Sequence, residues 1–228
     1  MNKYIALLIM MTVVIDASAS TNYLANGSFE QTFTDNYGQT VDASIDGSSA
    51  YGSGATATAY MPSWSADANW GYASNPNAAG TANPWGENYG LTVASDGNIA
   101  YGARGNNGSY FDIHQNTGAQ AAEGDTVTLT LDTIALSGDY GVNAWLNIYV
   151  QFLGDSQAQL VYVNTPQDVW TAQSLQVVVS AGQAGKDVRV QLQGAGVHVD
   201  NVRLEIETPP TNYVVNGSFE QSFTDGYG

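Results

Sequence analysis

The sequence predicts an all-β fold in which two antiparallel sheets form a sandwich. Apolar and polar residues alternate along several stretches of the chain, which is the period of a strand with one buried face. Glycine-containing turns separate these stretches at intervals that are typical of a sandwich. Long stretches with apolar residues three and four positions apart, which would indicate helices, are lacking.

The clearest alternation lies in the second half of the chain. It predicts strands over residues 125–136, 142–153, 175–179 and 188–192. Residues 36–108 are rich in Gly, Ala, Ser and Asn. There the sequence indicates only short strands near 57–60 and 98–103, joined by long ordered loops.

The first nineteen residues have the pattern of a secretory signal peptide. Lys3 precedes an apolar run over residues 4–15, and small residues follow at 17–19. The run is shorter than a comfortable membrane span, although a retained anchor is the alternative reading. We therefore expect a secreted or cell-surface protein that makes no membrane contact after signal removal.

Charge and cysteine content narrow the possible partners. The chain carries 21 acidic and 5 basic residues, a net charge of −16. Such a chain repels phosphate backbones and anionic lipid, which argues against nucleic acid and membrane surfaces as partners. Cysteine is absent, so no disulfide can brace the exported domain, and a bound metal ion would be an alternative brace.

An internal repeat divides the chain. Residues 21–38 recur as residues 211–228, with fourteen of eighteen positions identical. The second copy follows a stiff proline linker at 208–211. The expected organisation is a signal peptide at 1–19, a complete domain at 20–207 and the truncated start of a second copy at 212–228. A tail that completes a neighbouring molecule is the alternative.

Several short motifs follow one another along the domain. They are Asn26-Gly-Ser-Phe-Glu30, Pro62-Ser-Trp64, Gly97-Asn-Ile-Ala-Tyr101, Tyr110–Gln115 before Glu123-Gly-Asp125, Trp170-x-x-x-Ser174 and Val199-Asp-Asn-Val202. In this order the chain resembles the carbohydrate-binding modules of families 4 and 9 and their relatives in the galactose-binding-like superfamily. The resemblance spans residues 22–206 and implies a jelly-roll β-sandwich. It also implies that Trp64 lies in the core.

The same resemblance implies a structural calcium ion between the first and last strands. Its carboxylate ligands would be Glu30 and Asp200, beside backbone carbonyls. Calcium prefers such hard oxygen ligands. The alternative is that the two acids make only turn or cap hydrogen bonds.

Residues 143–152 supply the best candidate binding surface. Alternate side chains of a strand point to opposite faces, so the apolar residues at 144, 146, 148, 150 and 152 belong to the core. The other face presents Asn143, Trp145, Asn147, Tyr149 and Gln151. Rings can cover the apolar face of a sugar while amides bond its hydroxyls. The alternative is an ordinary solvated sheet face.

Two further strands could extend this surface. Tyr110, Asp112 and His114 alternate with apolar residues on one of them, and Arg189, Gln191 and Gln193 do so on the other. Among the remaining aromatic residues, we expect Trp170 to pack against the fold. Trp70, Trp85 and Tyr89 either pin down their loops, which we favour slightly, or line one end of the binding surface.

These features favour a non-catalytic, calcium-stabilised module that binds polysaccharide or oligosaccharide. Linked copies of a weak site would gain avidity. The main alternative is a structural or adhesive repeat protein, a surface-layer or filament subunit whose partners are neighbouring copies of itself. A cyclase-like or polysaccharide-degrading enzyme is less favoured, since nucleophile-elbow, zinc and phosphate-loop motifs are lacking. Asp112 and His114 would be its first candidate residues.

Overall fold

The computed structural model describes residues 21–34, 40–41, 49–52, 62–68, 71–74, 93–103, 110–135, 144–155, 158–163 and 168–209. Within these ranges the secondary structure consists of β-strands. They are β1 (Phe33–Thr34), β2 (Thr40–Val41), β3 (Ser49–Gly52), β4 (Ser65–Ala68), β5 (Gly71–Ser74), β6 (Ala100–Ala103), β7 (Phe111–Gln120), β8 (Thr126–Ala135), β9 (Trp145–Phe152), β10 (Ala158–Val163), β11 (Thr171–Val178), β12 (Asp187–Ala195) and β13 (Val197–Glu207). No helix in these ranges is long and apolar enough to cross a membrane.

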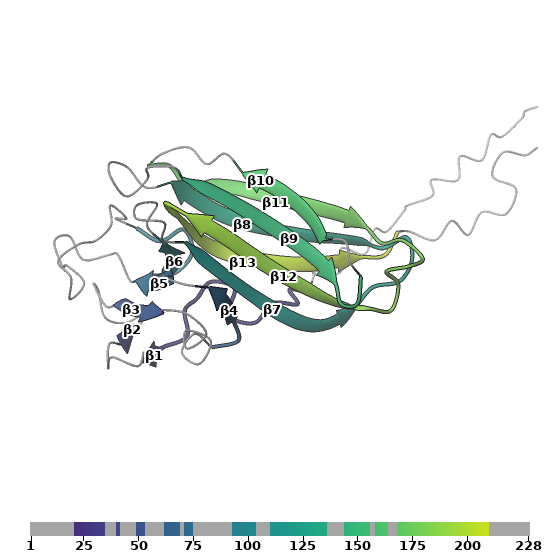
Figure 1. Ribbon diagram of the computed structural model, residues 1–228, viewed down its shortest axis with the longest axis horizontal. Coiled ribbons are helices and arrows are strands. Elements are labelled where there is room, and N and C mark those ends of the chain that lie inside the picture. The colour runs from purple at the N-terminus through teal and green to yellow at the C-terminus, as the bar shows by residue number, and fades with distance from the viewer. Residues whose placement is uncertain are drawn as a thin grey trace, which may run out of the picture.

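Two sheets form the layers of the sandwich. A five-stranded sheet has the order β10-β9-β12-β7-β4, and a six-stranded sheet has the order β11-β8-β13-β6-β5-β3. The first sheet lies in front of the second in Figure 1, and the strand pairs within both are antiparallel. The short strands β1 and β2 pair with each other and form a separate two-stranded sheet. The predicted all-β sandwich of two antiparallel sheets is confirmed.

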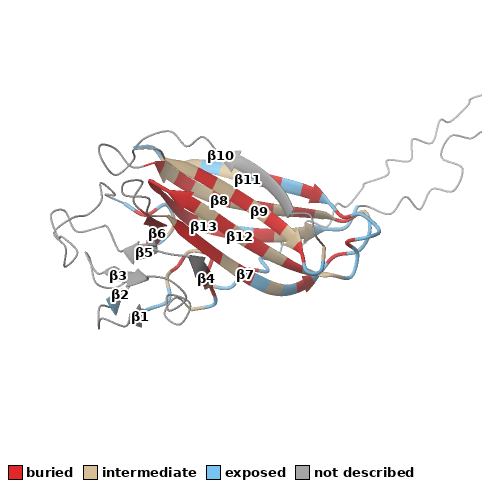
Figure 2. Ribbon diagram, in the orientation of Figure 1, coloured by how far each residue is buried: buried red, intermediate tan, exposed pale blue. Residues whose placement is uncertain are grey.

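The alternation in the sequence becomes an alternation in burial. Along β8, every second side chain from Val127 to Ala135 is buried, and those between are half-buried. The same two-residue pattern runs along β9 and β12 and gives these strands their chequered appearance in Figure 2. The apolar face predicted within 143–152 therefore lies in the core.

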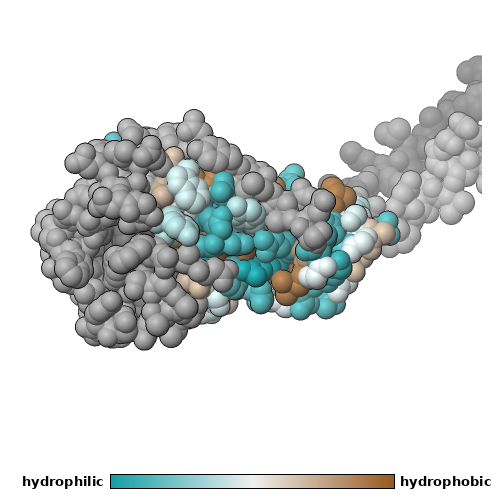
Figure 3. Space-filling model, in the orientation of Figure 1, coloured by the Kyte–Doolittle hydropathy of each residue, from teal (hydrophilic) through white to brown (hydrophobic). Residues whose placement is uncertain are grey.

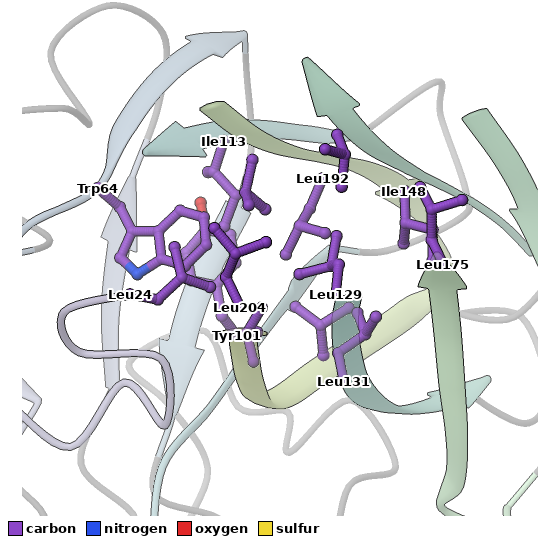
Figure 4. Packing of buried hydrophobic residues seen from close by; sticks show 14 of the residues in the cluster. Leu24, Trp64, Tyr101, Ile113, Leu129, Leu131, Ile148, Leu175, Leu192 and Leu204 are labelled. Atoms are coloured by element: carbon purple, nitrogen blue, oxygen red, sulfur yellow. The ribbon is translucent and has the colours of Figure 1, made fainter. Parts of the chain in front are cut away.

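The core fills the space between the sheets. Ile113, Ile148 and Leu192 come from the front sheet and meet Leu129 and Leu204 from the back sheet (Figure 4). All five are fully or almost fully removed from water, so the driving force for stacking the sheets is burial of their apolar faces.

Trp64 lies in this core, as the resemblance implies. It is 2% exposed, and its indole Nε1 donates a hydrogen bond to the Asn26 carbonyl over 3.1 Å. Its ring packs against Phe29 at a centroid distance of 5.7 Å, and Phe29 packs equally closely against Tyr101. The motif Asn26-Gly-Ser-Phe-Glu30, which we call the opening motif, is therefore held in place by an aromatic cluster and not by a regular strand.

Residues 22–27 run beside the last strand, β13. Tyr23 donates its backbone N–H to the Leu204 carbonyl over 2.9 Å, and Val202 donates to the Gly27 carbonyl over 3.0 Å. The Asn22 side-chain oxygen accepts the Leu204 N–H over 3.0 Å. Gly27 permits this approach, because a Cβ at that position would collide with the Val202 carbonyl. The two ends of the domain are thus joined by hydrogen bonds.

The first half of the domain departs from the sequence prediction. Strands β3, β4 and β5 were not predicted, because their Gly, Ala and Ser residues lack an alternating apolar pattern. The expected strand near 98–103 is β6. The one expected near 57–60 lies outside the described residues, as do Trp70, Trp85 and Tyr89.

Candidate functional site

The outer face of the front sheet gathers most of the predicted ligand residues. Strands β9, β12 and β7 are neighbours, and their register places Gln191 opposite both Tyr149 and His114. Gln193 likewise lies opposite Asn147 and Asp112. Because these side chains share one strand parity, they point away from the core. The described part of the molecular surface on this side is mostly hydrophilic (Figure 3). We call this surface the polar face.

Asp112 is the hub of a hydrogen-bond network on the polar face. Its Oδ1 accepts the amide Nε2 of Gln191 over 2.7 Å, and its Oδ2 accepts the Nε2 of Gln193 over 2.6 Å. The outer ends of the two glutamines are also engaged. Gln191 Oε1 accepts Nε2 of Gln151 over 3.0 Å, and Gln193 Oε1 accepts the Tyr149 hydroxyl over 2.8 Å. One carboxylate thus connects side chains of three adjacent strands.

An aromatic pair lies at one end of this network. Trp145, the first residue of β9, approaches Tyr110 with ring centroids 6.2 Å apart and planes inclined by 37°. Both rings are half-buried, and across the strands Trp145 lies opposite the small side chain of Ala195. The polar face therefore combines partly exposed apolar ring surface with a row of fixed hydrogen-bonding groups.

Arg189 marks the other end of the polar face, and His114 lies between the two ends, opposite Gln191. Arg189 lies opposite Gln151 on β9 and Asn116 on β7, two positions along β12 from Gln191. Both Arg189 and His114 are half-buried. Arg189 and the Trp145–Tyr110 pair thus lie at opposite ends of the polar face.

The structure places most of the predicted ligand set on one surface. The residues that share the polar face are Trp145, Asn147, Tyr149, Gln151, Asp112, His114, Arg189 and Gln191, with Tyr110, the residue before β7, against Trp145. Asn143 lies outside the described residues. Gln193, which the sequence also predicts to extend this surface, lies on the polar face as well. Alternation places it on this face, but its two bonds in the network follow only from the strand register.

Glu30 and Asp200 both bind one loop, residues 95–99. Glu30 Oε1 accepts the backbone N–H groups of Asn98 and Ile99 over 2.8 and 2.7 Å. Asp200 Oδ2 accepts those of Ser95 and Asp96, each over 2.8 Å. The two predicted metal ligands therefore meet at a single structural element.

Gly97 is required in this loop. It has a positive φ of 63°, and an added Cβ would lie 2.5 Å from the Glu30 carboxyl carbon. Glycine alone combines that backbone conformation with so close an approach. The motif Gly97-Asn-Ile-Ala-Tyr101 is thus explained by the contact between the loop and Glu30.

Asp200 is completely buried. Burial raises the pKa of its carboxyl to about 8, although backbone N–H donors of Asp96, Asn201 and Ser95 oppose that shift. Its Oδ1 accepts one of these donors, Asn201, over 2.7 Å. The carboxylate is costly to ionise here unless more positive charge approaches it.

The carboxylate oxygens determine how well a calcium ion would fit. Glu30 Oε2 accepts no hydrogen bond from the described residues, and Asp200 Oδ1 accepts a single N–H. These oxygens leave lone pairs for a cation, and backbone carbonyls could complete its shell. The described ranges contain no cluster of three or more acidic, His or Cys side chains suited to a metal ion. Protein carboxylates alone would therefore supply only part of the coordination.

The remaining predicted positions have structural roles. Trp170 is half-buried against Ala94 and Ala100, and its Nε1 donates to the Val93 carbonyl over 2.9 Å. His198 lies on the same strand parity as Asp200, opposite Gly102 and Ile134, and is fully buried. Burial lowers the pKa of His198 to about 3, so its imidazole is neutral at physiological pH.

The fold defines the chain as an all-β sandwich of two antiparallel sheets, with aromatic, amide and carboxylate side chains gathered on the outer face of one of them. No protein-family model matches the chain. A search of curated proteins likewise finds no similar sequence.

Solved structures with a similar fold do exist. A cyclase from Fischerella sp. TAU superposes with a TM-score of 0.57 at 14% identity, covering 82% of this chain and 97% of the cyclase. The same values hold for the Stig cyclase FisC of that organism in complex with (3Z)-3-(1-methyl-2-pyrrolidinylidene)-3H-indole. A family 61 carbohydrate-binding module in complex with beta-1,4-galactotriose gives a TM-score of 0.47 at 15% identity, over 82% of this chain and all of the module. At 14% identity, the similarity to the two cyclase structures supports the fold alone.

Proposed function

We propose that the protein is a non-catalytic extracellular module that binds an uncharged polysaccharide or oligosaccharide on its polar face. The observation that carries the proposal is the juxtaposition of the Trp145–Tyr110 pair with the amide network around Asp112. Rings offer apolar surface to the C–H face of a pyranose, and amides exchange hydrogen bonds with its hydroxyls. A net charge of −16 disfavours acidic glycans by long-range repulsion.

The proposal extends the resemblance to families 4 and 9 of such modules. The leader pattern at residues 1–19 supports export to the medium or cell surface. The repeated segment at 211–228 supports an arrangement in which copies of the domain follow one another. Linked copies would bind a polymer with avidity that one weak site lacks.

Binding to a panel of soluble glycans tests the proposed function. We expect the wild-type protein to bind at least one uncharged glycan in affinity electrophoresis or calorimetry. Trp145→Ala should weaken that binding at least about tenfold, equivalent to about 1.4 kcal/mol, because it removes ring surface from the site. Tyr23→Ala is the matched control, since Tyr23 is an exposed aromatic residue outside the polar face.

Other results would contradict this function. Failure to bind any glycan, together with ordered assembly at high concentration, would favour the structural or adhesive alternative. Release of shorter products from a bound glycan would contradict the non-catalytic assignment. Equal affinities of Trp145→Ala and the wild type would move the site away from the polar face.

We also propose that a calcium ion bound by Glu30 and Asp200 stabilises the folded domain. A cation would offset the cost of the buried Asp200 charge, and its binding free energy would add to the free energy of unfolding. We expect calcium to raise the melting temperature of chelator-treated protein, and Glu30→Gln to reduce that increase. Coincident melts with calcium and with chelator would show that the two acids serve only as hydrogen-bond acceptors for the 95–99 loop.

A further inference from the structure

Asp112 differs from the other residues of the polar face in its burial. Its side chain is only 7% exposed, so little of the carboxylate can reach a ligand. Both of its oxygens are already occupied by amide donors over 2.6 and 2.7 Å. The position of Asp112 thus suits a residue that acts on its neighbours rather than on a ligand.

We infer that Asp112 is a positioning residue that fixes the orientation of the Gln191 and Gln193 amides, and so sets the pattern of donors and acceptors on the polar face. The inference rests on the proposed function of that face. An amide group has a donor end and an acceptor end of nearly the same shape, and both orientations fit the same space. A carboxylate can only accept, so each glutamine must turn its Nε2 towards Asp112.

This choice propagates to the outer ends of the network. With Nε2 turned inward, the Oε1 of each glutamine points away from Asp112 and accepts from its neighbour. Gln193 Oε1 therefore accepts a hydrogen bond from the Tyr149 hydroxyl, and Gln191 Oε1 accepts one from Gln151 Nε2. Within the part of the chain that the structure describes, the Tyr149 oxygen and Gln151 Oε1 can still accept, and the second N–H of each central glutamine can still donate. A face with both kinds of group matches the hydroxyls of a sugar, each of which donates one hydrogen bond and accepts others.

The isosteric change Asp112→Asn would reverse part of this pattern while preserving the shape of the site. An asparagine carries one acceptor and one donor end, so it can accept from only one of the two glutamines. The other must present its Oε1 to the new donor and turn Nε2 outward. If Gln193 turns, its Nε2 faces Tyr149, and the Tyr149 hydroxyl must donate its hydrogen bond elsewhere. If Gln191 turns, its Nε2 faces Gln151, and the Gln151 amide must turn as well to present its Oε1.

Two measurements on the full chain test the role of Asp112. Asp112→Asn should weaken binding of whichever uncharged glycan the wild type binds by about tenfold or more. In nuclear magnetic resonance spectra recorded without glycan, it should also shift the side-chain amide signals of at least one central glutamine and of its outer partner. Asp187→Asn is the matched control. It removes one charge from β12, the strand that carries Gln191 and Gln193, at a side chain that accepts Gln120 Nε2 over 2.8 Å, and it should change neither measurement.

The outcomes separate this inference from the proposed function. Unchanged amide signals for Gln191 and Gln193 in Asp112→Asn, or undiminished glycan affinity, would overturn the positioning role. Absence of glycan binding by the wild type would overturn the proposed function alone, because the amide signals report on Asp112 without a ligand. If Asp112→Asn does not fold, Tyr149→Phe replaces it. That change should shift the amide signals of Gln193 and leave those of Gln191 in place, and a shift of neither would overturn the inference.

Discussion

Replacing Phe29 by alanine is expected to lower the free energy of unfolding by about 3–5 kcal/mol, the range for truncating a buried phenylalanine. Phe29 is fully buried, and its ring contacts both Trp64 and Tyr101. Its backbone also has a positive φ of 57°, a conformation that is uncommon for a side chain of this size. Loss of the ring would remove the contacts that hold this conformation and leave a cavity beneath the opening motif.

The measurement is chemical denaturation of the purified chain, followed by tryptophan fluorescence. The repeat provides the control, because Phe219 occupies the position in 211–228 that corresponds to Phe29. Residues 22–27 already run beside β13, and Phe29 already fills the aromatic cluster with Trp64 and Tyr101. We therefore expect Phe219→Ala to leave the unfolding transition of the domain unchanged. Equal destabilisation by the two substitutions would show that the second copy also contributes to the stability of this domain.

Acidification is expected to destabilise the domain through His198. Burial lowers its pKa from 6.5 to about 3, whereas in the unfolded chain the imidazole titrates near its ordinary value. Between these two values the unfolded chain binds a proton that the folded domain does not. The contribution of His198 to stability is therefore fully present above pH 6.5 and is lost as the pH falls towards 3. At about 1.4 kcal/mol for each pKa unit, lowering the pKa from 6.5 to about 3 corresponds to a loss on the order of 5 kcal/mol.

His198→Gln isolates this contribution. Glutamine is neutral throughout, so the wild type should lose stability relative to the variant as the pH falls from 7 to 4. Any pH-independent effect of the substitution on the free energy of unfolding cancels, because only the pH dependence of the two proteins is compared. Asp200 acts in the opposite direction: its pKa is raised to about 8, so its contribution weakens as the pH rises from about 4. Since Asp200 is present in both proteins, parallel stability curves would contradict the assignment to His198.

The fold was predictable wherever burial imposes a period of two. Strands β8, β9 and β12 have one face in the core and the other outside it, and their sequences alternate accordingly. The start of β11 was not predicted, since the expected strand began at residue 175 and the observed one begins at Thr171. Its first four side chains lie half-buried or exposed, so burial imposes no apolar period on them. Hydrogen bonding to β8, rather than burial, maintains that part of the strand.

The sequence predicted which residues form the candidate site, but not the hydrogen bonds that join them. Alternation alone places Trp145, Tyr149 and Gln191 on an outer face. It does not reveal that Asp112 joins two glutamines, because that depends on the register between β7 and β12. The shared loop of Glu30 and Asp200 was likewise hidden. Backbone N–H groups of residues 95–99 are the donors. Almost every residue type carries such a group, so the sequence does not show which ones bind the carboxylates.

The hydrogen bonds between residues 22–27 and β13 determine how the domain would respond to mechanical tension. The bond of Tyr23 to Leu204 lies nearest both ends of the domain, and the bond between Gly27 and Val202 lies further inside. A force applied across residues 21 and 208 would load these bonds sequentially, in an unzipping geometry. In a shear geometry, by contrast, all the bonds would be loaded together. The opening segment would therefore separate first, and a string of such domains would extend by releasing these segments before any sandwich unfolds.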